Sequence, residues 1–372
     1  NMRNDMNWIK SISVVLIMMV ISIKCADLLL GYLAPESTFG VNDRGTERSL
    51  NMREINPHFN AVLWPSEEYM KRTDSLERRG YIIRTDEFGF IDNGNEINFS
   101  EKASKSIIFL GGSTTEQLYV PEKSRWSSIL ERNLNKIDQE NSYIIRNGGF
   151  SGNNSMHSNL NLIAKALPLS PDFVVLMHNV NDLGLLRLTG SYWQAPKKLS
   201  LMEIHKNESS IFLMLRQIKD YLIPNSYNLL KNTLSRSNND DYKEYRGSKI
   251  KGIKLIEDQF RRSLNTFIDV SLAWGTEPIL MTQFNRVNLE DELFNKTSLS
   301  MINKEEYVQS YVRLNDVIRE VSASRNVDLI DLANLIPSSS NYIYDIVHLN
   351  ENGSKLAAEI LTDYWLRKLE LQ

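Results

Sequence analysis

The sequence predicts an α/β fold in which helices cover both faces of a parallel β-sheet. From residue 105 onward, short apolar runs rich in β-branched residues alternate with longer segments of helical periodicity. The strand candidates are residues 106–110, 143–146, 172–177, 278–282 and 327–330, and helical candidates between them include 125–134, 253–272 and 305–324. This alternation is typical of parallel sheets, because each parallel strand needs a long crossover connection to the next.

Several polar or glycine residues come directly after these predicted strands. Ser113 follows the first strand, Gly152 follows the second and Asn181 follows the third. In open parallel sheets the ligand site lies at the carboxyl ends of the strands. We therefore expect these three residues to meet at one edge of the sheet.

Composition excludes several classes of function. The 372 residues include 43 Lys and Arg against 46 Asp and Glu, with no block of like charge, so nothing predicts nucleic-acid binding. The single cysteine, Cys25, cannot form an intramolecular disulfide. Four of the five histidines, namely His58, His157, His178 and His205, show no metal-ligand spacing with cysteine or carboxylates. No metal and no cofactor is therefore expected.

The N-terminal residues 1–33 differ in kind from the rest of the chain. Residues 11–23 carry no charge, and the apolar character resumes after Lys24. The length approaches the roughly 20 residues of a membrane-spanning helix. Because Arg3 and Lys10 precede the run, we expect a retained membrane anchor with the remaining chain periplasmic or extracellular. A cleaved signal peptide and a buried core helix are the alternatives.

The remaining chain divides into a connector and a main domain. Residues 34–104 are polar and punctuated by proline and glycine, and are interpreted as a juxtamembrane connector that packs on the main domain, residues 105–372. Residues 184–250 interrupt the strand–helix alternation and are too long for a simple connection. We interpret them as an insertion over the active edge, with a solvated excursion as the alternative; Trp193 within them is a candidate for stacking on a sugar.

Ser113, His348 and Asp345 are candidates for a catalytic triad. A neutral serine is a poor nucleophile and needs a base within hydrogen-bond reach, and that base needs a third group to fix its tautomer. His348 stands three residues after Asp345, before a helical run, so both side chains can project toward one cleft. Capping of the final helix by this pair is the structural alternative.

Acyl transfer also needs donors directed at the developing oxyanion. The candidates are the Ser113 amide, the Gly152 amide and the Asn181 side chain, because glycine permits close backbone approach to a substrate. Taken singly, Gly152 could belong to an ordinary turn and Asn181 to a helix cap.

Four short blocks carry a resemblance to a known family. They read Gly-Gly-Ser-Thr-Thr at 111–115, Asn147 to Asn153 with Gly152, Asn-Val-Asn-Asp at 179–182, and Asp-Ile-Val-His at 345–348. The chain resembles the SGNH (GDSL-like) hydrolases over residues 105–372. Gly112 stands where many members carry an acidic residue, and Asn179 stands where the third block usually begins with glycine, so Asn179 is expected to contact substrate.

The resemblance implies a three-layer α/β/α, flavodoxin-like domain with a five-stranded parallel sheet, and a metal-free acyl-enzyme mechanism on esters. The order of segments, with an N-terminal anchor, then a connector, then this domain, is similar to that of bacterial members associated with cell-surface polysaccharides. The expected function is therefore a membrane-anchored serine esterase that removes an acyl group, acetyl in the first instance, from a carbohydrate. A polysaccharide O-acyltransferase with the same triad and a non-catalytic glycan-binding protein are the alternatives.

Overall fold

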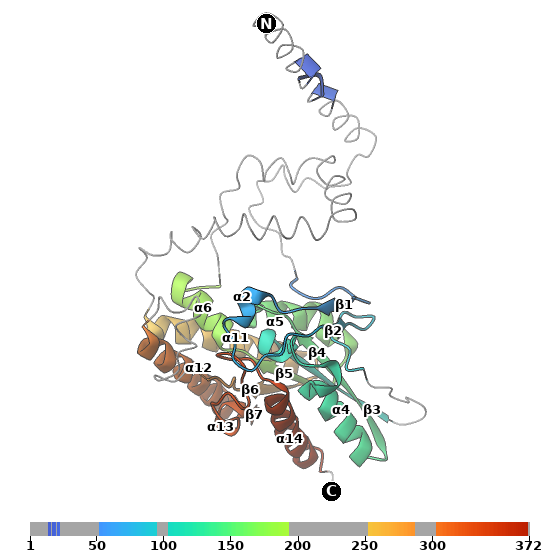
Figure 1. Ribbon diagram of the computed structural model, residues 1–372. Coiled ribbons are helices and arrows are strands. Elements are labelled where there is room, and N and C mark those ends of the chain that lie inside the picture. The colour runs from blue at the N-terminus through green and yellow to red at the C-terminus, as the bar shows by residue number, and fades with distance from the viewer. Residues whose placement is uncertain are drawn as a thin grey trace, which may run out of the picture. The chain divides into compact units, whose positions relative to one another are not determined.

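The computed structural model describes residues 14–15, 17–19, 21–22, 52–94, 103–192, 252–286 and 303–370. At its centre is a five-stranded parallel sheet of strand order β4-β3-β5-β6-β7 (Figure 1). The strands are β3 (Ala103–Gly111), β4 (Asn141–Gly149), β5 (Phe173–Met177), β6 (Glu277–Met281) and β7 (Asp328–Ile330). This is the flavodoxin-like order, in which the first strand of the sheet lies between the second and the third, and the prediction of a five-stranded parallel sheet is confirmed.

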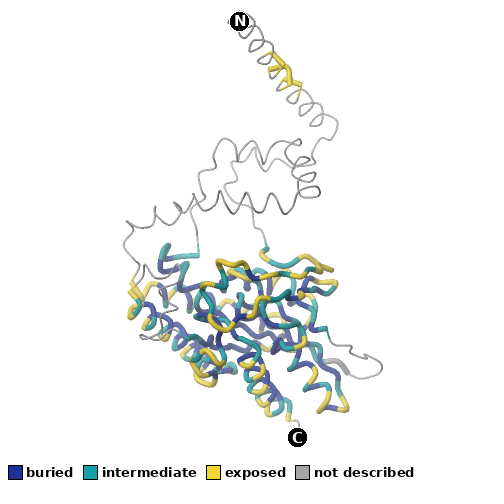
Figure 2. The backbone as a smooth tube through the Cα atoms, in the orientation of Figure 1, coloured by how far each residue is buried: buried dark blue, intermediate teal, exposed yellow. Residues whose placement is uncertain are grey.

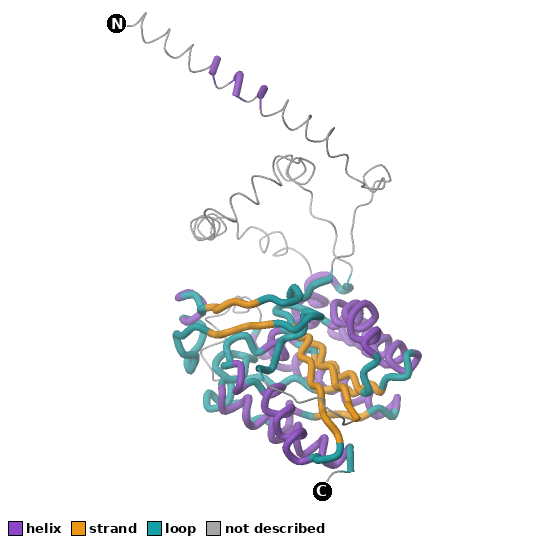
Figure 3. The backbone as a smooth tube through the Cα atoms, turned by 90° about the vertical axis from the view of Figure 1, so that its right-hand side faces the viewer, coloured by secondary structure: helices purple, strands orange, loops and turns teal. Residues whose placement is uncertain are grey.

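Helices cover the two faces of this sheet in two groups (Figure 3). One face packs against α6 (Val180–Thr189), α11 (Ile253–Ala273), α12 (Lys304–Arg325) and the turns that follow α5 (Ser155–Asn161). The other face packs against α4 (Trp126–Ile137) and α14 (Glu351–Lys368). The shorter elements are α2 (Glu67–Met70), α3 (Ser113–Glu116), η2 (Glu122–Ser124), the π-helical turn η3 (Leu162–Ala166), η4 (Leu167–Leu169) and α13 (Leu332–Leu335).

Alternation of side chains along the strands builds one core on each face. In β3, Ile108 and Leu110 lie in the core beneath α11 and α12, whereas Ile107 and Phe109 lie in the core beneath α4 and α14. All four are buried, as expected for a strand covered on both sides. Buried segments gather in the interior of the domain and exposed ones at its surface (Figure 2). An apolar core on each face thus packs against the sheet and fixes the points at which the loops leave its carboxyl edge.

Residues 52–94 pack on this domain. They contain an antiparallel pair, β1 (Asn60–Leu63) with β2 (Tyr81–Arg84). Beyond β2, Ile91 forms a bridge to Asn147 of β4, and the Asn93 amide donates to the Ile145 carbonyl at 2.7 Å. Phe90 is fully buried in the core beneath α11. This part of the predicted connector is therefore packed against the main domain, next to the edge strand β4.

Other predictions fall partly or wholly outside the described residues. Most of residues 1–33 lie outside them, and within the part of the chain that the structure describes no helix is long and apolar enough to cross a membrane. Helix α6 continues through Gly184 to Thr189, so the first residues of the predicted insertion belong to a helix of the domain. Residues 193–251, including Trp193, lie outside the described ranges.

Candidate active site

Ser113 is held at the carboxyl edge of the sheet by the sharp end of β3. The strand ends at Gly111, Gly112 adopts an extended conformation, and Ser113 begins the single-turn helix α3. The Phe150 amide donates to the Gly111 carbonyl at 3.2 Å, which ties this turn to the loop that follows β4. The serine hydroxyl is thus presented at the edge, directly after a central strand.

His348 and Asp345 complete a hydrogen-bonded relay with Ser113. His348 Nδ1 lies 2.6 Å from Asp345 Oδ2, and His348 Nε2 lies 2.7 Å from Ser113 Oγ. Because a carboxylate can only accept, Nδ1 carries the proton and Nε2 is free to accept from the serine hydroxyl. Asp345 Oδ1 accepts from the amides of Val347 and His348, so the carboxylate is fixed by its own loop.

Asp345 and His348 shift each other's pKa in opposite directions. Burial acts to raise the pKa of Asp345, but His348 and the hydrogen bonds to the carboxylate hold that pKa below its ordinary value. Burial acts to lower the pKa of His348, but the charge of Asp345, its hydrogen bond and the more distant Glu116 raise that pKa above its ordinary value. Asp345 therefore stays ionised, and His348 is a stronger base than a free imidazole.

The Asn181 side chain lies beside the nucleophile. Its Nδ2 donates to the Asn153 carbonyl at 2.7 Å, and a Cβ added to Gly112 would come within 2.6 Å of the same Nδ2. The absence of a side chain at residue 112 therefore makes room for the Asn181 amide next to Ser113. The structure thus explains glycine at this position by a close approach.

Gly152 occupies a turn that an arginine from residues 52–94 fastens. Gly152 has φ of +79°, which favours glycine. Arg53 donates from Nη1 to the Gly152 carbonyl and from Nη2 to the Ser151 carbonyl, both at 3.1 Å. The Arg53 carbonyl in turn accepts from the Asn153 side chain at 3.0 Å. With two carbonyls of this loop held by Arg53, the orientation of the Gly152 peptide is fixed.

Two pockets meet at Ser113 and His348. The first, here the catalytic pocket, has a volume of about 300 Å³ and is lined by Tyr69, Ser113, Leu118, Tyr119, Ser151, Tyr344 and His348. The second has a volume of about 210 Å³, and apolar side chains of Val180, Ile346 and Val347 contribute to its walls beside Asn181. A substrate ester can thus lie across the serine, with a different group in each pocket.

Tyr69 lines both pockets and contacts the triad, a role that the sequence did not predict. Its hydroxyl donates to Asp345 Oδ2 at 3.2 Å and lies 3.3 Å from the Tyr344 hydroxyl. Burial and the Asp345 carboxylate raise the pKa of Tyr69, so the hydroxyl keeps its proton and acts as a donor. The only local signal is that Ser66 caps α2, which predicts a helix and not a function.

Glu116 is a second residue that the sequence did not single out. It is the last residue of α3, its side chain is buried, and the Ser151 hydroxyl donates to its Oε2. Burial raises the pKa of this carboxyl. Glu116 thus holds the Ser151 side chain in the loop after β4, and Arg53 holds the Gly152 carbonyl in the same loop.

Asn179 lines neither of the two pockets at Ser113, so its contact with substrate stays a prediction. The residue is fully buried, and its Nδ2 donates to the Tyr311 carbonyl and to Asn315 Oδ1, both on α12. Its side chain therefore ties the start of α6 to α12, and its position gives no support to a contact with substrate.

His178 lies in the protein core, and its surroundings decide its protonation state. His178 is buried, its Nε2 lies 2.7 Å from the Ser158 hydroxyl, and burial lowers its pKa to about 3. It is a neutral core histidine rather than a base.

Within the described ranges, no group of three or more histidine, cysteine or acidic residues is arranged to hold a metal ion.

Solved structures similar in fold include esterases and acylhydrolases. Axe2, an acetylxylan esterase from Geobacillus stearothermophilus, is 14% identical, with 73% of this chain and 96% of that protein covered at a TM-score of 0.43. The acetyl xylan esterase AlAXEase is 16% identical, with 70% of this chain and 98% of that protein covered at 0.42. A lipase/acylhydrolase from Enterococcus faecalis is 16% identical, with 72% and 97% covered at 0.42.

No protein-family model matches the chain, and no curated protein matches it in sequence. At these identities and TM-scores the likenesses assign no activity, so any functional conclusion rests on the geometry of the site.

Proposed function

We propose that this protein is a serine esterase that removes an acyl group, acetyl in the first instance, from a carbohydrate through an acyl-enzyme intermediate. The observation that carries the proposal is the relay from Asp345 through His348 to Ser113, with contacts of 2.6 and 2.7 Å and the serine open to two pockets. Nucleophile, base and orienting group are in hydrogen-bond reach without any rearrangement.

In the acylation step, Ser113 Oγ attacks the ester carbonyl while His348 Nε2 takes the hydroxyl proton. The Nδ1 proton remains on the imidazole, and the ionised Asp345 stabilises the imidazolium that forms. Negative charge develops on the carbonyl oxygen. The Ser113 amide, the Gly152 amide and the Asn181 side chain are the proposed donors to it. The carbonyl then re-forms as the bond from the acyl carbon to the sugar oxygen breaks, and the imidazolium protonates that oxygen so that the sugar leaves as an alcohol.

In the deacylation step, a water molecule replaces the sugar. His348 Nε2 takes a proton from this water, whose oxygen attacks the acyl carbon, and the proton returns to Ser113 Oγ as the carboxylic acid leaves. The 210 Å³ pocket has the size for a short acyl chain, and the tyrosines of the catalytic pocket offer faces on which a sugar ring can pack. These features support a short acyl group and a carbohydrate leaving group.

The deciding experiment combines Ser113→Ala with covalent labelling by a fluorophosphonate probe. We expect the wild-type protein to be labelled at Ser113 and to hydrolyse p-nitrophenyl acetate. We expect Ser113→Ala to lose labelling and to lose about 10⁴-fold or more in kcat. Ser324→Ala is the matched control, because the Ser324 hydroxyl only donates to the Val321 carbonyl within α12. Equal labelling and turnover in the wild type and in a folded Ser113→Ala variant would contradict the proposal.

We also propose that residues 1–33 anchor this enzyme in a membrane with the catalytic domain outside. The support is in the sequence alone, namely the uncharged residues 11–23 preceded by Arg3 and Lys10. Membrane fractionation with carbonate extraction is the test. The full chain should stay with the membrane, and a form beginning near residue 52 should not. Release of the full chain by carbonate would exclude an anchor.

A further inference from the structure

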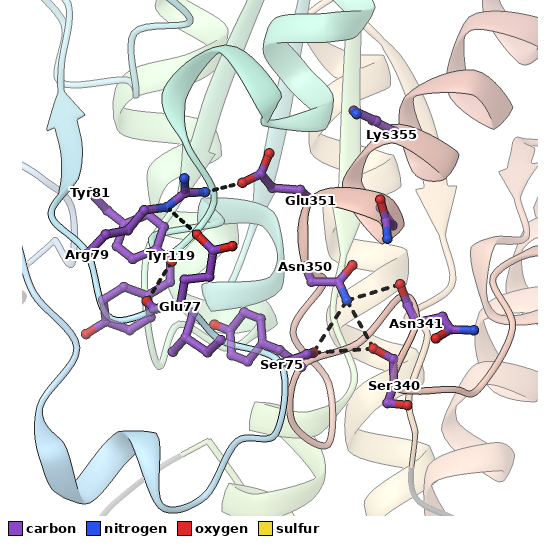
Figure 4. Close-up of a pocket in the computed structure, with 13 residues that line it drawn as sticks. Ser75, Glu77, Arg79, Tyr81, Tyr119, Ser340, Asn341, Asn350, Glu351 and Lys355 are labelled. Atoms are coloured by element: carbon purple, nitrogen blue, oxygen red, sulfur yellow. Dashed lines mark hydrogen bonds and ion pairs between the residues drawn. The ribbon is translucent and has the colours of Figure 1, made fainter.

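A third pocket, which we call the outer pocket (Figure 4), shares lining residues with the catalytic pocket and has no part in the chemistry above. Its volume is about 460 Å³, and its walls come from residues 75–81, Tyr119 and residues 340–355. Tyr119 and Tyr344 line both the outer pocket and the catalytic pocket. A molecule that is too long for the catalytic pocket can therefore continue past these two tyrosines into the outer pocket.

One wall of the outer pocket is fixed by hydrogen bonds across the start of α14. Asn350 Nδ2 donates to the carbonyls of Ser340 and Asn341, both at 3.1 Å, and Asn350 Oδ1 caps the helix at the Gly353 amide. The Ser75 hydroxyl donates to the same Ser340 carbonyl at 3.3 Å. The pocket is thus preformed by contacts between the two segments, which limits the ordering cost of binding.

The charged side chains on the opposite wall compensate one another. Arg79 forms ion pairs with Glu351 and with Glu77, and its guanidinium lies over the Tyr81 ring at 5.3 Å from the centroid. With Lys355, the lining of the outer pocket holds two basic and two acidic side chains, so its charges balance. The wall therefore favours a neutral ligand that hydrogen-bonds to it.

Three polar side chains of the outer pocket remain available to such a ligand. Asn341, Asn352 and Lys355 are exposed, and within the described part of the chain their side chains make no hydrogen bond or ion pair. Each amide offers donors and an acceptor, and the ammonium offers donors only. These groups can bind hydroxyls, which act as both donor and acceptor.

Aromatic rings connect this polar wall to the triad. The Tyr119 ring lies 5.5 Å from that of Tyr81 and 5.3 Å from that of Tyr69, and the Tyr344 ring stacks on His348 at 5.6 Å. Tyr81 and Tyr344 are buried, whereas Tyr69 and Tyr119 are partly exposed between the outer pocket and Ser113. Aromatic faces in such positions suit molecules whose rings have an apolar face and a polar rim.

We propose that the outer pocket is a subsite for a neighbouring unit of a neutral oligosaccharide whose acylated unit lies at Ser113. The inference rests on the proposed esterase function and narrows its substrate from any sugar ester to an acylated oligosaccharide. Binding energy from the outer pocket then positions the ester over the serine.

The first test compares substrates of different length with the wild-type enzyme. Acetylated tetrasaccharides of xylose, mannose and glucose are set against the corresponding monosaccharide acetates and p-nitrophenyl acetate. We expect kcat/KM for at least one tetrasaccharide to exceed that for its monosaccharide by about tenfold or more. Turnover of p-nitrophenyl acetate with no length preference in any of the three series would overturn the subsite and leave the esterase function intact.

The second test measures binding without turnover. In the Ser113→Ala background, calorimetry with the unacetylated tetrasaccharide of the preferred series should detect binding that the monosaccharide lacks. If the wild-type protein neither hydrolysed p-nitrophenyl acetate nor reacted with the fluorophosphonate probe, the esterase function would be rejected. The binding measurement would still show whether the outer pocket takes an oligosaccharide.

The third test fills the outer pocket. In Asn352→Trp, the ratio of tetrasaccharide kcat/KM to p-nitrophenyl acetate kcat/KM should fall by about tenfold, and tetrasaccharide binding in the Ser113→Ala background should fall to the same extent. The matched control is Asp363→Trp, an exposed position about three turns further along α14 and outside the pocket. An unchanged ratio and unchanged binding in a folded Asn352→Trp variant would overturn the proposal.

Discussion

The Tyr69 hydroxyl and Nδ1 of His348 both donate to Oδ2 of Asp345, at 3.2 and 2.6 Å. The tyrosine comes from α2, far from Asp345 and His348 in the sequence, and it also lines both pockets at Ser113. Asp345 is thus fixed by its own loop through Oδ1 and by residues 52–94 through Oδ2. The orientation of His348, the proposed base, therefore depends on a segment that carries none of the four sequence blocks.

We predict that Tyr69→Phe lowers kcat by about tenfold and moves the acid limb of the pH–rate profile to higher pH. Without this donor, the carboxylate interacts more strongly with the imidazolium, so the pKa of His348 rises further. Tyr364→Phe is the matched control, because it removes a similar bond, from Tyr364 to Asp328 Oδ2 at 2.8 Å, on the last helix. A purely structural role would lower stability without moving the pH profile, and that result would refute the positioning role.

The activity should fall as the pH is lowered through the raised pKa of His348. The base must be neutral to accept the serine proton, and Asp345 raises the pKa of His348 above the roughly 6.5 of a free imidazole. The acid limb should therefore lie above about pH 6.5, and Asp345→Asn should move it downward while lowering kcat less than His348→Ala does. A rate that stays constant from neutral pH to pH values well below this limb would remove histidine from the mechanism.

Gly112→Ala should lower kcat by about 10²–10³ with little change in KM. The added Cβ would lie 2.6 Å from Asn181 Nδ2 and 3.1 Å from the Asn153 carbonyl, so the proposed oxyanion donor must move. The matched control is Gly184→Ala on α6, where an added Cβ meets nothing within 4 Å. This control should keep full activity and stabilise the fold by about 0.5–1 kcal/mol, because alanine is the better helix former. Wild-type kcat in Gly112→Ala would argue against Asn181 as a donor.

Arg53→Ala should lower kcat by about fivefold while fluorophosphonate labelling of Ser113 persists. The substitution removes the two bonds to the carbonyls of Ser151 and Gly152, and a looser loop aligns the Gly152 amide less well with the oxyanion. Arg132→Ala is the matched control, since Arg132 Nη2 donates to the Lys123 carbonyl away from the triad. Steady-state kinetics should separate the two variants, and equal kcat values for them would contradict the role of Arg53.

Much of the sheet and part of the site could be predicted from the sequence. The strand runs and helical segments are local patterns, and a chain that alternates them has few ways to bury both faces of the sheet. The placement of Ser113, Gly152 and Asn181 after successive strands follows from the same rule. Asp345 and His348 are close in sequence, so a single loop is enough to bring their side chains together.

Tertiary structure alone decided the roles of Tyr69, Arg53 and Asn179. Tyr69 and Arg53 come from a segment with no recognisable catalytic pattern, and only its packing on the carboxyl edge brings them to the Asp345 carboxylate and the Gly152 loop. Asn179 stands within a recognisable block, yet its side chain is hydrogen-bonded to α12 and lines neither pocket at Ser113. Local sequence patterns report which elements form, because periodicity and turn chemistry act over a few residues. Which side chains meet across the sheet edge depends on long-range packing, which those patterns do not encode.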